Sequence, residues 1–283
     1  MKFSQAQADV YLHAGAASAE AALTRVTHLC VSAHQDDIEI MAYHGIAECF
    51  GRVDRRFGAV VVTNGAGSPR TGLYESMTDA GMQLVRRDEQ RKAAALGDYE
   101  VCLQLAHPSA AVKDPRNEAV RGDLEAIFTA CRPQVVYLHN PADKHDTHVA
   151  VMLRALRALR ALPADRRPAR VLGCEVWRDL DWLNDDEKQV LDTSARPNLA
   201  ASLLGVFDSQ ISGGKRYDLA AVARRVANAT FQASHAVDKV TAANWAIDLT
   251  PLANDSDIPV ENFVLGAIDR FRAEVQARLR RFA

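Results

Sequence analysis

Several features that mark specialised protein classes are scarce in this chain of 283 residues. Its five cysteines are scattered, odd in number and without a Cys-x-x-Cys pair, so a disulfide framework is not expected. No apolar run approaches the ~20 residues that cross a bilayer, and the N-terminus lacks the apolar core of a signal peptide. These absences favour a cytoplasmic protein that does not span a membrane.

The chain also lacks an excess of charge of either sign. Its formal net charge is −2 and its pI is near 6.5, so no global field favours nucleic acid or an anionic membrane as the partner. Arg278, Arg280 and Arg281 form a basic end, but cations favour the last turn of a helix without any nucleic acid. We therefore expect a small-molecule partner at a local site, and the sequence leaves a homo-oligomer open.

Short apolar, β-branched runs alternate with longer helical patterns along the chain. The alternation predicts a mainly parallel sheet with helices on both faces, a Rossmann-like three-layer α/β sandwich. The proline-rich breaks near 163–168 and 192–197 are too short for a domain linker, so residues 1–283 are expected to form a single domain. The predicted strands cover 27–33, 57–63, 100–106, 134–139 and 171–177, and the predicted helices cover 5–24, 38–52, 73–97, 116–131 and 147–161.

The last third of the chain continues this mixture. The pattern predicts a helix over 215–236 and a late edge strand over 244–249. A final helix is predicted with one buried stripe, because apolar residues recur there at helical spacing. The stripe comprises Val260, Phe263, Val264, Ala267, Ile268, Phe271, Val275 and Leu279.

Two clusters of metal-binding residue types follow two of the predicted strands. His34, Asp36 and Asp37 come directly after 27–33, and His145 and His148 follow 134–139. Because the carboxyl ends of parallel strands meet at one edge of a sheet, both clusters should share a crevice there. Alone, the first is typical of a helix cap and the second of two surface imidazoles. Their matched location favours a common metal site.

Three of these residues would complete such a site. His34, Asp37 and His148 offer nitrogen and oxygen donors and leave a fourth position for water, which is the usual form of a catalytic zinc centre. Iron, manganese or cobalt would accept the same donors. Asp36 is then free to act on the water as a base.

These motifs resemble the PIG-L, or LmbE-like, family of zinc-dependent N-acetylglucosaminyl deacetylases. Residues 33–39 are similar to its signature Ala-His-Pro-Asp-Asp-x-Glu, and 145–148 match the spacing of its second signature, close to His-x-Asp-His. Further similar elements lie at 63–65, 86–89, 93–97 and 207–210. The resemblance implies His34, Asp37 and His148 as zinc ligands.

The resemblance also implies the chemistry. It assigns Asp36 as general base and a protonated His145 as the group facing the developing oxyanion. The substrate would be a small acetamido sugar or glycoconjugate, and the products acetate and a free amino sugar. In this family an acid is expected behind the active-site imidazole, but Thr147 stands at its position, so Asp143 or Asp146 would have to replace it.

The chain departs from the family at two further places. Gln35 replaces the usual proline, which would loosen the turn, and residues 106–109 replace an Asp-Gly pair, so substrate contacts there should differ. Arg70 could contact the substrate or be a solvated arginine, and His44 could support the site from behind or be a core histidine.

Other kinds of site find little support. Residues 65–67 form a bare Gly-x-Gly, which is mostly a turn, so no nucleotide cofactor is assigned. No serine sits in a Gly-x-Ser-x-Gly elbow, which disfavours a serine hydrolase. Two rival hypotheses remain open because one fold hosts many functions. The same metal site could hydrate an unsaturated acid or hydrolyse a different amide, or the protein could be a non-catalytic carbohydrate-binding or metal-binding relative.

Overall fold

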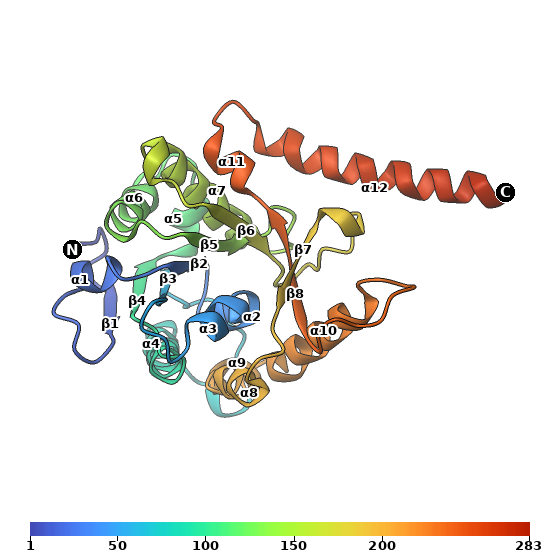
Figure 1. The fold of residues 1–283 in the computed structure, drawn as a ribbon. Helices are drawn as coiled ribbons and strands as arrows, with labels where there is room; N and C mark the ends of the chain where they lie inside the picture. Colours follow the sequence, from blue (N-terminus) through green and yellow to red (C-terminus); the bar gives the residue numbers. More distant parts are fainter.

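Eight strands form one mixed sheet in the computed structural model, which describes residues 1–283 (Figure 1). They lie in the order β1-β4-β3-β2-β5-β6-β8-β7. The strands β4, β3, β2, β5 and β6 run parallel, and the pairings of β1, β8 and β7 are antiparallel. The predicted α/β class with a mainly parallel sheet is confirmed. The strands cover Asp9–Leu12 (β1), His28–Ser32 (β2), Phe57–Thr63 (β3), Val101–His107 (β4), Val135–His139 (β5), Arg170–Cys174 (β6), Lys188–Asp192 (β7) and Ala243–Asp248 (β8).

Helices pack against both faces of the sheet. One core contains side chains of α1 (Ala19–Leu23), α5 (Ser109–Lys113), α6 (Ala119–Cys131), α7 (Asp146–Ala161) and α11 (Thr250–Asn254). The other contains side chains of α2 (Asp37–Met41), α3 (Tyr43–Cys49), α4 (Asp79–Leu96), α8 (Pro197–Gly205) and α10 (Tyr217–Phe231). The short α9 (Asp208–Ile211) precedes α10, and 3-10 turns cover Gly72–Tyr74, Ala164–Arg166 and Asp185–Glu187.

Burial on both faces explains why the parallel strands could be recognised in the sequence. In β2, Leu29 and Val31 belong to one core and Cys30 to the other. Successive side chains point to opposite faces, so a strand covered on both sides is apolar throughout. The runs predicted at 27–33 and 57–63 therefore coincide closely with β2 and β3.

The order of the parallel strands creates a crevice at one point of the sheet. From β2 the chain moves outward through β3 and β4, then returns to the other side of β2 and continues through β5 and β6. The connections therefore diverge between β2 and β5, which leaves a crevice outside the carboxyl ends of these two strands. In Figure 1 these strands lie at the centre of the sheet.

Three predictions for the chain outside the parallel strands are right only in part. The predicted helix 5–24 contains β1, which pairs with the open edge of β4 and whose Asp9 forms an ion pair with Arg91. Pairing satisfies the backbone of both strands and outweighs helix propensity there. The predicted helix 38–52 is interrupted between α2 and α3. The predicted edge strand 244–249 corresponds to β8, but the unpredicted β7 covers its outer side.

The final helix, α12 (Val260–Phe282), is confirmed, but the prediction of its buried stripe is wrong. Figure 1 shows α12 extending away from the sheet after its first turns. Val260 and Phe263 pack partly against the core and Ala267 is buried, whereas Leu279 is 67% exposed. Helical spacing predicts a common face but does not show that another element covers it. None of the helices combines the length and hydropathy of a transmembrane segment.

Candidate metal centre

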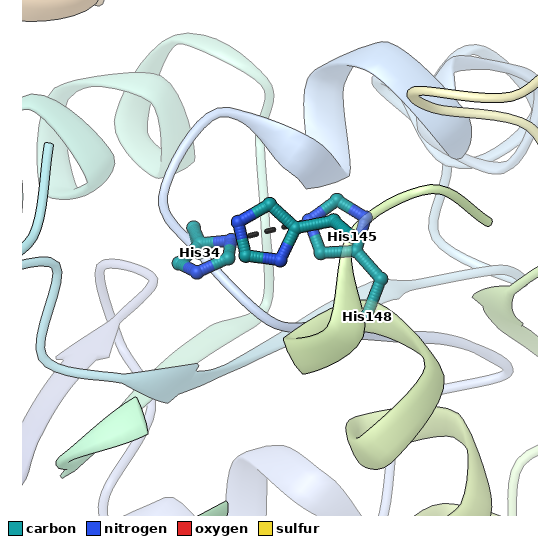
Figure 2. Close-up of side chains that lie close together, drawn as sticks. All are labelled: His34, His145 and His148. Atoms are coloured by element: carbon teal, nitrogen blue, oxygen red, sulfur yellow. Dashed lines mark hydrogen bonds between the residues drawn. The ribbon is translucent and has the colours of Figure 1, made fainter. Parts of the chain in front are cut away.

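The two acid and imidazole clusters meet at the crevice between β2 and β5. The first lies where β2 ends and α2 begins, and the second lies at the start of α7, after β5. β2 and β5 are paired neighbours, with His28 opposite Val135. The structure therefore brings the side chains of His34, His145 and His148 together (Figure 2), and Asp37 lies beside His148.

Three donor atoms form a nearly equilateral triangle. His34 Nδ1 lies 3.2 Å from His148 Nε2 (Figure 2) and 3.3 Å from Asp37 Oδ2, and His148 Nε2 lies 3.3 Å from the same oxygen. Zinc bonds of ~2.0–2.2 Å in tetrahedral geometry place neighbouring donors roughly 3.3–3.5 Å apart. The triangle therefore fits a single divalent ion, and it is the donor set expected from the sequence.

The protonation of these ligands suits a cation. Burial lowers the pKa of His34 to about 4, so its ring is neutral at physiological pH. Burial opposes ionisation of Asp37, but the surrounding imidazoles of His148, His34 and His139 outweigh it and hold the pKa of this carboxyl well below its usual range. Asp37 therefore remains a carboxylate. The backbone N–H of His34 donates to its Oδ2 at 2.8 Å, which fixes the turn.

A buried histidine, His139, also reaches this cluster. Its Nε2 lies 3.6 Å from Asp37 Oδ2, but the same nitrogen accepts the backbone N–H of Ala33 at 2.8 Å. The lone pair is thus engaged, so His139 is a poor ligand. Its ring stacks on that of His148 with centroids 3.9 Å apart, and it therefore orients a ligand. In the sequence, its only sign was its position at the end of a strand.

Asp143 holds the metal-binding face of His148 in place. Its Oδ2 lies 3.4 Å from His148 Nδ1 and accepts the backbone N–H of Trp177 at 3.2 Å, while Oδ1 accepts the backbone N–H of His145 at 3.1 Å. A carboxylate behind a ligating imidazole fixes its tautomer and orientation. Asp143 therefore stands behind His148 rather than behind the His145 ring, and Asp146 is exposed in the first turn of α7.

Replacing Asp143 is expected to weaken metal binding. Asp143→Asn should lower zinc affinity ~10–100-fold, because the amide cannot fix the His148 ring as a carboxylate does. Competition with a chromophoric chelator would measure the change. Asp146→Asn, an exposed change three residues away in the first turn of α7, is the matched control. Equal affinities for the two variants would show that Asp143 does not support the ligand.

His145 is placed to act as a neutral hydrogen-bond donor. Its Nδ1 accepts the backbone N–H of Thr147 at 3.2 Å, which leaves the proton of the neutral ring on Nε2. Burial and the neighbouring His148 both lower the His145 pKa. The neutral ring is therefore favoured over the protonated form that the resemblance implied. This ring is oriented by a backbone group, so it needs no acid at position 147.

Asp36 sits in a strained turn that α4 holds in place. Its φ is +83°, a conformation that most residues avoid but Asp and Asn tolerate better. The backbone N–H of Asp36 donates to Gln90 Oε1 at 3.3 Å, and Arg86 donates to the carbonyl of Gln35 at 2.8 Å. Burial raises the pKa of the Asp36 carboxyl well above its usual range, partly offset by Arg86. Asp36 lines the same cavity as the metal ligands His34 and Asp37, and the raised pKa makes its ionised carboxylate a strong proton acceptor there.

Gln35, which replaces the family proline, does not loosen the turn as predicted. Its Nε2 donates to Gln104 Oε1 on β4 at 3.0 Å, while Arg86 binds its carbonyl. The amide fits because residue 65 is glycine: a Cβ there would lie 2.5 Å from Gln35 Oε1, and the φ of Gly65 is +71°. The Gly-x-Gly turn at 65–67 thus leaves room for the Gln35 side chain and supports the turn that contains Gln35 and Asp36.

A cavity of about 430 Å³ opens over the centre. His34, Asp36, Asp37 and His145 line it, and hereafter it is called the catalytic cavity. Glu89 on α4 accepts hydrogen bonds from the backbone and hydroxyl of Ser209, which ties two family-like elements together. The other polar or charged side chains that line the catalytic cavity are Ser68, Arg86, Ser109, Lys113, Thr147, Gln210, Lys215 and Tyr217.

Two predicted site residues have other partners. Arg70 donates to the carbonyls of Ala66 and Met77 and pairs with Asp79, so its guanidinium shapes its own loop. His44 Nδ1 lies 2.9 Å from the Tyr137 hydroxyl. Neither lines the catalytic cavity. Their contribution to substrate binding or to support of the centre stays a prediction.

Comparison with known proteins agrees with this geometry. Residues 29–159 match the model of the PIG-L family, described as GlcNAc-PI de-N-acetylase. This segment of the chain is similar to the PIG-L family. The matched residues include all three members of the donor triangle, Asp36 and His145. No sequence among the curated proteins matches the chain.

Several solved structures share the fold. The conserved protein TT1542 from Thermus thermophilus is 18% identical, with 79% of this chain and 94% of that chain covered and a TM-score of 0.61. The N,N′-diacetylchitobiose deacetylase from Pyrococcus horikoshii is 16% identical, with 83% and 88% covered and a TM-score of 0.62. GalB, the 4-carboxy-2-hydroxymuconate hydratase from Pseudomonas putida, is 18% identical, with 79% and 96% covered and a TM-score of 0.57.

Proposed function

We propose that this protein is a PIG-L family member and a metal-dependent N-deacetylase that acts on an acetamido sugar or sugar conjugate, as a single Rossmann-like three-layer domain. Zinc is the first choice of metal, held by His34, Asp37 and His148, and iron, manganese or cobalt would suit the same donors. The donor triangle beneath a polar cavity, with a buried carboxyl beside it, is the observation that carries the proposal.

The residues around the donor triangle have separate roles in the proposed amide hydrolysis. A bound divalent ion would polarise the amide carbonyl and lower the pKa of water from ~15.7 toward ~7. Asp36 accepts the water proton as the new C–O bond forms. The Nε2–H of His145 donates to the carbonyl oxygen as negative charge develops there. Asp36 then returns the proton to the nitrogen as the C–N bond breaks, which yields acetate and a free amine.

The catalytic cavity suits the sugar half of such a substrate. Ser109, Lys113 and Gln210 offer polar groups along its wall, and each can hydrogen-bond to hydroxyls. Lys113 and Lys215 form no ion pair with any carboxylate of the chain. The cavity therefore presents donors and cations that water or substrate must satisfy.

Acetate release is the direct test of the proposed activity. The purified protein would be incubated with a panel of acetamido sugars and glycoconjugates, before and after chelation, and again after loading with zinc. We expect release that stops on chelation and returns with metal. A protein that binds metal tightly yet frees no acetate from any member of the panel would contradict the proposal.

A second candidate is addition of water to an unsaturated acid at the same centre. The cations of Lys113 and Lys215 in the catalytic cavity would suit a carboxylated substrate, and the fold is shared with a hydratase. Loss of ultraviolet absorbance from 4-carboxy-2-hydroxymuconate, in the absence of acetate release from acetamido sugars, would favour this reaction.

Metal loading is expected to release a proton. Burial opposes protonation of His148, but the carboxylates of Asp37 and Asp143 outweigh it and raise the His148 pKa above the ordinary 6.5. A ligating imidazole must be unprotonated, so metal affinity should fall as the pH drops through this pKa. His34, with its pKa lowered to about 4, contributes no proton at neutral pH.

Titration calorimetry checks the proton release. Zinc would be added in two buffers that differ in ionisation enthalpy, at about pH 6 and about pH 8.5. We expect about one proton released at the lower pH, where His148 supplies it; at the higher pH the water on the metal, with its pKa lowered toward ~7, becomes the source instead. A binding enthalpy that is independent of the buffer at the lower pH would show that His148 is already unprotonated.

A further inference from the structure

A second cavity, of about 200 Å³, opens beside the catalytic cavity. We call it the side cavity. It shares part of its wall with the catalytic cavity, so the two adjoin. Ile40 belongs to this shared wall and lies three residues after Asp37 in α2, which places the side cavity within one helical turn of a proposed metal ligand. The shared residues are Ile40, Val176, Trp177, Lys215 and Tyr217.

The lining of the side cavity is mostly apolar. Six of its 11 lining residues are hydrophobic, against four of 18 in the catalytic cavity. The rings of Trp177 and Tyr217 meet edge to face, with centroids 5.8 Å apart, and form the common wall. The Trp177 backbone is held by Asp143, the carboxylate behind His148. The apolar wall is thus attached to the metal centre.

The polar side chains around the side cavity mostly have partners already. Arg224 donates to the carbonyl of Val176, Arg216 pairs with Asp218, and Asn244 Oδ1 accepts from Arg225 at 3.2 Å. A hydroxyl-rich sugar would find few free hydrogen-bonding groups here, whereas an apolar group would lose nothing on entry.

Two further polar groups complete this lining. Lys215 Nζ sits 4.6 Å from the Trp177 ring centroid, over its face. Glu175 uses Oε1 for Asn228 and the backbone of Trp245, and its buried Oε2 has no partner. Burial raises the pKa of this carboxyl, which favours its neutral form.

The two cavities therefore suit the two halves of an N-acylated amino sugar. The sugar half is polar and fits the catalytic cavity, whose lining includes hydroxyl, amide and ammonium groups. The acyl half begins one bond from the carbonyl carbon, which must lie at the metal. An acyl chain longer than acetyl would reach the adjoining apolar space.

We infer that the side cavity is the acyl subsite, and that the preferred substrate is an amino sugar N-acylated with a medium-length aliphatic chain rather than with acetyl alone. This inference rests on the proposed amide hydrolysis. Each methylene that enters the cavity should raise kcat/KM roughly three- to fourfold, because burying one CH₂ contributes ~0.8 kcal/mol. The gain ends when the chain outgrows the cavity.

The test uses N-acyl glucosamines that carry acetyl, butanoyl, hexanoyl and octanoyl groups, with the metal-loaded enzyme and an amine readout. Ala220, an exposed residue of α10, lines only the side cavity, so Ala220→Phe should fill it from the rim. The ratio of kcat/KM for hexanoyl over acetyl should fall at least ~10-fold in this variant. Ala223→Phe, exposed on the same helix and outside both cavities, should leave the ratio unchanged.

The outcomes separate this inference from the proposed function. Equal kcat/KM across the series would overturn the acyl subsite and leave amide hydrolysis standing. The same conclusion would follow if kcat/KM rises with acyl length but Ala220→Phe, with an unchanged melting temperature, does not reduce that rise. No amine from any member would overturn the proposed function itself. A second series uses alkyl glycosides of N-acetylglucosamine, in which the alkyl chain is the aglycone. If kcat/KM rises with the length of the aglycone but not of the acyl chain, and Ala220→Phe removes that rise, the side cavity binds the aglycone. That result would overturn the acyl assignment.

Discussion

Asp36→Asn is expected to lower kcat/KM for amide hydrolysis by at least ~100-fold while the metal content stays at the wild-type level. The carboxyl of Asp36 is buried beside the donor triangle but contributes none of its three atoms. An amide of the same shape cannot accept the water proton. Activity should therefore fall through kcat, since neither the metal nor the shape of the cavity changes.

Asparagine is the informative replacement because of the backbone at this position. The φ of Asp36 is +83°, which asparagine tolerates and alanine tolerates less well. Asp36→Ala would add backbone strain to loss of the base. Metal content by elemental analysis and the melting temperature serve as controls. Turnover close to that of the parent, with metal bound, would remove Asp36 from the mechanism and favour a non-catalytic relative.

Asp37→Asn should lower activity still further, because it removes the negative charge of a proposed metal ligand. Asp37 Oδ2 lies 3.3 Å from both His34 Nδ1 and His148 Nε2 and accepts the His34 backbone N–H. The amide keeps that acceptor but lacks the negative charge that offsets the cation. We expect bound zinc below ~0.1 per chain and activity at least ~1,000-fold lower, not restored by added metal.

Thermal unfolding supplies an independent readout of this variant. Metal at a thousandfold excess over Kd stabilises a folded protein by ~4 kcal/mol, which corresponds to a rise in melting temperature of roughly 8–16 °C for a chain of this size. The wild type should show this rise with zinc and Asp37→Asn should not, whereas the exposed control Asp146→Asn should behave as wild type. A full zinc-induced rise in Asp37→Asn would place the metal elsewhere.

The strands that could be predicted from the sequence are those that helices cover on both faces of the sheet. β2 and β3 are covered on both faces, so their sequences are apolar throughout and easily recognised. β1 is an edge strand with one buried residue, Asp9, in an alanine-rich segment, and its local sequence favours a helix. Its pairing with β4 depends on a strand nearly a hundred residues away, which local propensity cannot register.

Some roles in the site depended on contacts that spacing does not encode. His34, Asp37 and His148 could be chosen from their positions after two strands. The neutral tautomer of His145 follows from the backbone N–H of Thr147, and His139 is excluded as a ligand by the backbone N–H of Ala33. Asp143 supports His148 because the loop folds back beneath that ring.

The sequence by itself determined which donors this chain possesses and at which end of which strand they stand, because motif chemistry and strand alternation are local properties. Only the tertiary structure decided which nitrogen faces the ion, which carboxylate lies behind which ring, and that an apolar cavity adjoins the polar one. The physical reason is that these choices arise from hydrogen bonds and packing between segments distant in the chain, such as Asp143 with Trp177 and Arg225 of α10 with the carbonyl of Ile40.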